Sequence, residues 1–235
     1  MRKFIIAFTV MMQIHIIVGA EIKNGYEKRI DEIKLALENL KKRINEDNNM
    51  DSIFGDELSF LQKQKMSLKI DSLKQLILNY EITKKILDQF SFIAPDLYNE
   101  IDTIKNAYGE KTDVYVKFVP DENMTESQLG MTSMGPCLDD ENICYSEDGI
   151  RTVLVLIYTR TKPLFVLAHE FGHVKYQVPH LASYIVYFKK TYLDQSYDRY
   201  FIGHYPTDPS GKVALRYERR FRRYVKIYKK NTSII

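Results

Sequence analysis

The residues best able to carry out a reaction form one short run, His169-Glu170-Phe171-Gly172-His173. Two histidines four positions apart lie on one face of a helix, so both imidazoles can reach a single zinc ion. The glutamate after the first histidine points to the open side of such a metal, where it can take a proton from zinc-bound water. A Lewis acid, an acidified water and a general base together predict hydrolysis of a peptide bond.

The surroundings of this run indicate a buried helix. The chain has only 5 histidines in 235 residues, and we estimate that the pattern arises by chance in about one such chain in a hundred. Residues 164–168 are apolar, and Phe171 and Val174 continue that character. Pro163 suits the first turn of a helix, and Pro179 suits its end.

The nine residues Val166-Leu167-Ala168-His169-Glu170-Phe171-Gly172-His173-Val174 resemble the metal-binding helix of the zincin metallopeptidases. The resemblance implies zinc ligands at His169 and His173 and a general base at Glu170. One departure is Lys175, where the family usually has an apolar residue. In zincins a strand upstream of this helix borders the active-site cleft and pairs with an extended substrate. The sequence leaves open whether residues 113–119 or 151–158 would do this.

A catalytic zinc usually takes three protein ligands and keeps one position for water. Glu218 is the gluzincin-like choice for the third ligand, because it lies on a predicted later helix, 45 residues after His173. The competing interpretation of Glu218 is an ordinary surface ion pair with Arg222. Asp208 is an alternative ligand of the aspzincin kind, and His204 is another.

His180 is the weakest candidate for the third ligand. The metzincin pattern HExxHxxGxxH would place its last histidine at position 179, but this position holds Pro179. Tyr176 occupies the glycine position, where the chain must reverse, and a tyrosine makes that reversal costly.

The first 20 residues have the features of a secretory signal peptide. Arg2 and Lys3 precede a mostly apolar stretch, and small residues at 18–20 precede the expected cleavage before Glu21. A transmembrane anchor is the competing interpretation, but the segment is short and Gln13 and His15 interrupt it. We therefore expect an exported protein, periplasmic or secreted, and no membrane span in the mature chain.

Charge excludes no enzyme class but argues against nucleic acid as a partner. Without Arg2 and Lys3, 32 of the 34 basic side chains remain against 31 acidic ones. Residues 121–148 hold eight acidic and no basic residues, and residues 212–230 hold nine basic residues and only Glu218 as an acid. Both runs are explained as solvated surface, as a pair across the domain, or as an acidic loop that helps to hold a cation such as calcium.

Cys137 and Cys144 are the only cysteines. In an oxidising compartment two cysteines this close most simply form one disulfide. The bond would close the acidic loop and contribute about 2–3 kcal/mol.

Two long helices are predicted before the motif, over residues 22–46 and 56–90, each with an apolar stripe. A short polar link between them indicates a hairpin. We interpret this hairpin mainly as packing support; contact with a partner and shielding of the active site are the alternatives. A shorter helix from Pro95 towards Gly109, a loop-rich segment at 123–145 and a final helix at 212–229 capped by Ser210 complete the prediction.

These patterns predict a signal peptide at 1–20, a helical hairpin region at 21–92 and an α+β zincin-like catalytic domain at 93–235. The expected activity is zinc-dependent hydrolysis of peptide bonds in a peptide or protein substrate. The alternative is an exported helical interaction module whose metal site is structural or degenerate.

Overall fold

The computed structural model describes residues 22–50, 56–120, 129–134, 145–146, 149–150, 152–183 and 208–232. The predicted signal peptide, the predicted Cys137–Cys144 disulfide and His204 lie outside these residues. The described residues form a mixed α+β fold, which confirms the predicted class.

A four-stranded sheet has the order β1-β2-β6-β3. Strands β1 (Ile22–Asn24), β2 (Asp113–Phe118) and β6 (Thr152–Ile157) run parallel, and β3 (Gly130–Met134) pairs antiparallel with β6. Alternate valines of β2 and β6, followed by Phe118 in β2 and Ile157 in β6, point to one face, where they are almost fully buried. A separate pair is formed by β4 (Tyr145–Ser146) and β5 (Gly149–Ile150).

Two of these strands correct the sequence prediction. Residues 130–134 were expected in a loop, because Gly-Met-Thr-Ser-Met has little β-propensity; pairing with β6 makes them a strand. Residues 22–24 were expected to begin the first helix, but they pair with residues 114–116 of β2. The helix itself begins at Ile30. Ile22 is extended because it pairs with Val114 of β2.

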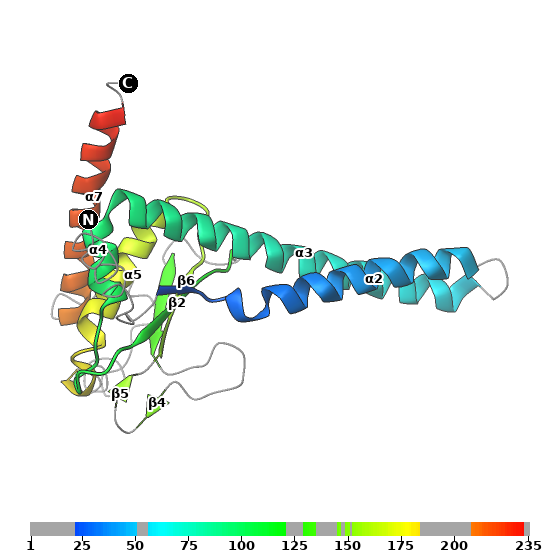
Figure 1. Ribbon diagram of the computed structural model, residues 1–235, viewed down its shortest axis with the longest axis horizontal. Helices are drawn as coiled ribbons and strands as arrows, with labels where there is room; N and C mark the ends of the chain where they lie inside the picture. The colour runs from blue at the N-terminus through cyan, green and yellow to red at the C-terminus, as the bar shows by residue number, and fades with distance from the viewer. Residues whose placement is uncertain are drawn as a thin grey trace, which may run out of the picture.

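The first two long helices form the predicted hairpin. After a 3-10 turn (η1, Glu27–Arg29), α2 (Ile30–Met50) lies alongside α3 (Asp56–Ile93), and together they project from the sheet as an arm (Figure 1). The last turns of α3 leave the arm and enter the core through Ile86, Leu87 and Phe90. One continuous helix therefore belongs both to the arm and to the domain.

The remaining helices of the described residues are α4 (Pro95–Asp102), α5 (Pro163–Gln177) and α7 (Pro209–Thr232). They pack with the end of α3 and the buried side of the sheet in one core. Helix α4 ends seven residues before Gly109, which was expected to terminate it; Gly109 instead has a positive φ of 80° in a later turn. Within the described residues, none of the helices combines the length and apolar character needed to cross a membrane.

Candidate metal centre

Helix α5 carries the histidine motif on a largely buried helix. Pro163 occupies its first turn, as predicted, directly after Lys162 in a left-handed conformation. Glu170 and His173 are buried, whereas about a quarter of the His169 side chain remains exposed. The centroids of the two histidine rings lie 5.0 Å apart at an interplanar angle of 71°. The spacing in the sequence thus places both imidazoles on one face, as predicted.

Gly172 allows α7 to approach that helix unusually closely. A Cβ atom at Gly172 would lie 2.4 Å from the Cα of Ala214 and 2.9 Å from the carbonyl oxygen of Val213. Real Cβ atoms do not approach backbone atoms this closely, so any other residue at position 172 would force the helices apart. The side chains of α7 can consequently reach the histidines of α5.

Glu218 on α7 lies next to His169. Its Oε2 is 3.6 Å from Nδ1 of His169, and its Oε1 accepts a hydrogen bond from Arg222. The ion pair with Arg222, the competing interpretation from the sequence, is therefore confirmed, and the same carboxylate lies beside His169. A separation of 3.6 Å is too long for a hydrogen bond, but it is close to the roughly 3.4 Å between two ligand atoms on one tetrahedral zinc.

Two imidazoles and a carboxylate are a donor set that suits zinc. Within the described part of the chain, however, no three His, Cys, Asp or Glu side chains form a group that could hold a metal ion as they now stand. The parts of such a set nevertheless lie near one another: the two imidazole rings are 5.0 Å apart, and the Glu218 carboxylate is 3.6 Å from the His169 ring. The residues present therefore fit the metal that the motif implies.

Behind His173 lies a buried polar chain that runs through Ser210. Nδ1 of His173 is 2.8 Å from the Ser210 hydroxyl, and Nε2 of Gln177 donates to the same oxygen at 2.9 Å. If Nδ1 carries the proton and donates it to Ser210, Nε2 keeps the lone pair that binds a metal. The other amide atom, Oε1 of Gln177, is buried and has no hydrogen-bond partner among the described residues.

Asp208, not Ser210, caps helix α7. Its Oδ1 accepts the Ser210 N–H at 2.9 Å, and its carbonyl accepts the Lys212 N–H at 3.1 Å. Asp208 is 2% exposed. The predicted cap was wrong because Ser210 is turned towards His173 instead. Sequence reasoning missed this supporting role, since nothing in the spacing of positions 173 and 210 indicates that they meet.

Strand β3 contacts the buried Glu170 from the sheet. Oε2 of Glu170 accepts a hydrogen bond from Oγ1 of Thr132 at 2.7 Å. A Cβ at Gly130 would lie 2.9 Å from Oε1 of the same carboxylate, so a glycine leaves room for it there. Both contacts were missed, because residues 130–134 were expected to be a loop.

His180 makes its contacts with Tyr176 at the end of α5. Its ring stacks on Tyr176, with the centroids 4.9 Å apart, and its Nδ1 is 2.9 Å from the Tyr176 carbonyl oxygen. These contacts hold the ring at the end of α5, in agreement with the failure of the metzincin register.

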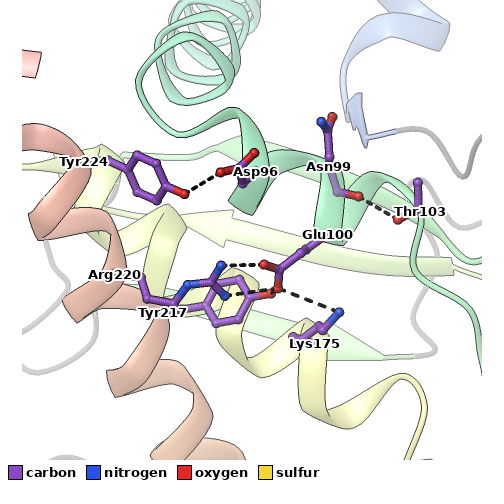
Figure 2. A network of polar contacts seen from close by, with 8 residues as sticks. All are labelled: Asp96, Asn99, Glu100, Thr103, Lys175, Tyr217, Arg220 and Tyr224. Carbon is purple, nitrogen blue, oxygen red and sulfur yellow. Dashed lines mark hydrogen bonds and ion pairs between the residues drawn. The ribbon is translucent and has the colours of Figure 1, made fainter. Parts of the chain in front are cut away.

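A network around Glu100 joins α4 to α5 and α7 (Figure 2). The Glu100 carboxylate accepts hydrogen bonds from both terminal nitrogens of Arg220 and from the Tyr217 hydroxyl, and it lies 3.8 Å from Nζ of Lys175. The Arg220 guanidinium in particular holds the pKa of Glu100 below its usual value of 4.5. Burial, followed by the hydrogen bond to Glu100, raises the pKa of Tyr217. Lys175, the departure from the zincin pattern, thus has a partner on α4.

No protein-family model matches this chain, and neither a curated protein nor a solved structure is found to match it. Indications of its function therefore come from the histidine motif and from the geometry around it.

Proposed function

We propose that this protein is an exported zinc-dependent metallopeptidase with a zincin-like, gluzincin-type site. The observation that carries the proposal is the approach of Glu218 on α7 to His169 on α5, at 3.6 Å. The motif alone accounts for two ligands and a base. A carboxylate from a later helix beside the first histidine is the third ligand that a catalytic site of this kind requires.

His169, His173 and Glu218 would hold the zinc, which when bound supplies a Lewis acid and an acidified water. Glu170 follows a ligand in the sequence and is fixed between α5 and β3, so it is the proton acceptor of the proposed reaction. Ser210 orients the His173 ring from behind. The contacts that support these roles come from α5, α7 and β3.

Strand β3 is the surface on which an extended peptide would be bound. It lies at the end of the sheet order, and among the described residues no strand pairs with its outer side. A peptide substrate can add to such an edge through main-chain hydrogen bonds. The two strands considered from the sequence, β2 and β6, are both interior strands of the sheet, so neither offers this edge.

The test is to compare metal content and peptide cleavage in three variants of the mature protein. Glu170→Gln should retain zinc and lose cleavage by about 100-fold or more, because it lacks only the base. Glu218→Gln should lose zinc, because a neutral amide replaces an anionic ligand. Glu27→Gln, on the exposed turn before α2, is the control and should behave as the wild type.

Elemental analysis measures the metal, and mass spectrometry of a digested peptide library measures cleavage. Zinc-loaded wild-type protein that cleaves no peptide would favour the alternative, an interaction module with a structural metal site. Full zinc content and activity in Glu218→Gln would reject Glu218 as the third ligand and direct attention to Asp208 and His204.

A further inference from the structure

The backbone of β3 shows which of its residues face the open edge of the sheet. The Tyr158 N–H donates to the Leu129 carbonyl at 3.0 Å, next to the register pair Gly130–Ile157. Hydrogen-bonded and non-hydrogen-bonded pairs alternate along an antiparallel ladder. Met131 therefore directs its backbone bonds to β6, whereas Gly130 and Thr132 direct their N–H and C=O groups away from it.

The side chain of Thr132 points in a different direction from its peptide groups. Its hydroxyl lies 2.7 Å from Oε2 and 3.2 Å from the main-chain oxygen of Glu170 on α5. The neighbouring edge-facing residue, Gly130, provides the space for the other carboxylate oxygen. The residue whose main chain faces the open edge is thus the residue that contacts the buried glutamate.

We propose that Thr132 is a positioning residue for Glu170, with its hydroxyl fixing the carboxylate and its main chain bonding the substrate strand. The inference builds on the proposed peptidase function and adds a direct connection between the substrate-binding edge and the base. A substrate strand that pairs with Thr132 aligns the peptide and the carboxylate through the same residue. Loss of the hydroxyl should therefore impair the chemical step more than substrate binding.

The contact itself can be tested without activity, by thermal unfolding of four proteins. These are the wild type, Thr132→Val, Glu170→Ala and the double variant. Thr132→Val keeps the shape of the side chain and removes the hydroxyl. It should lower Tm by about 2–4 °C in the wild-type background. The effect should be clearly smaller when Glu170 is already alanine, because only the longer contact with the main-chain oxygen of residue 170 is then left to lose. Equal shifts in both backgrounds would overturn the inference.

The positioning role is tested by steady-state kinetics of the zinc-loaded enzyme. We expect Thr132→Val to lower kcat by about 10- to 100-fold with KM changed less than about twofold. Thr132→Ser, which restores the hydroxyl, should recover most of kcat. Thr103→Val removes an exposed hydroxyl bonded to Asn99 on α4 and should leave both constants unchanged.

The results separate this inference from the proposed function. A wild-type protein without peptidase activity rejects the proposed function and with it the role of Thr132 in catalysis. An active wild type with Thr132→Val at full kcat, or a loss that Thr132→Ser fails to restore, rejects the positioning role alone.

Discussion

At the residue scale, the centre depends on side chains that touch its histidines from behind as well as on the histidines. Ser210 is fully buried, and its one hydroxyl meets both His173 and Gln177. Partners of this kind fix the ring orientation and the tautomer of a ligating histidine. Without the Ser210 hydroxyl, the buried polar atoms of His173 and Gln177 would lose this hydrogen-bond partner.

We predict that Ser210→Ala lowers zinc affinity by about 10- to 100-fold, since the His173 ring loses the group that orients it. Competition with a chromogenic chelator measures the affinity. Ser91→Ala is the matched control, because the exposed Ser91 hydroxyl donates to the Asp88 carbonyl, one turn back on α3. Equal zinc affinity in wild type and Ser210→Ala would show that the hydroxyl does not support the ligand.

The sequence predicted the residues of the centre only where their relation is local. His169, Glu170 and His173 share one helix, and helical periodicity places them together without further information. Glu218 could be proposed from its chemical type and its position on a later helix, although several alternatives stayed open. Thr132 and Ser210 could not be found, because their contacts with α5 depend on how β3 and α7 pack in three dimensions.

At the element scale, the network around Glu100 holds α7 against α4 and α5. Glu100 accepts hydrogen bonds from Tyr217, one position before Glu218, and from Arg220, two positions after it. One turn further along α7, Tyr224 donates to Asp96. On α5, Gly172 allows the backbone of α7 to come close at Ala214. The periodicity of apolar residues in the sequence indicated that these segments are helices. It could not indicate which of their faces are in contact.

We predict that Glu100→Gln lowers the free energy of unfolding by about 1 kcal/mol at neutral pH, a figure reduced for partial exposure of the pair. The pKa of Glu100 is depressed in the folded state, so its contribution is present above the unfolded value near 4.5 and is lost as the pH falls through the folded pKa. The difference between wild type and variant should therefore shrink below pH 4.5.

Urea denaturation at a series of pH values measures this difference. Asp71→Asn, which breaks an exposed pair with Lys74 on α3, is the control and should cost little. A difference for Glu100→Gln that grows towards acid pH would contradict the prediction.

At the scale of the whole molecule, stability should be distributed unevenly between arm and domain. Among its described side chains, α2 buries only Ile30 and Leu37. The end of α3 buries Phe90 completely, where it stacks on Phe221 at 4.8 Å and meets Phe171 edge-on at 5.2 Å. The apolar stripes indicated both helices of the arm. They could not show that only the end of α3 reaches the core.

We predict that amides in α2 exchange with solvent much faster than those of residues 83–93 in α3, because the arm can open without the domain. Hydrogen exchange followed by mass spectrometry measures both segments in one experiment.

Phe90→Ala should lower the free energy of opening that protects the amides of the domain by about 3–5 kcal/mol, because it leaves a cavity in the core. Equal protection of α2 and the end of α3 would mean that arm and domain unfold as one unit.

The division of the centre between α5 and α7 has a consequence for the timing of synthesis. The histidine motif leaves the ribosome well before residues 209–232, which bring Ser210 to His173 and Glu218 to His169. With Glu218 as the proposed third ligand, a chain that is still being made lacks this ligand until α7 has been synthesised. In the proposed function, hydrolytic activity begins only when α7 docks, so the export machinery and neighbouring nascent chains are not exposed to an active peptidase.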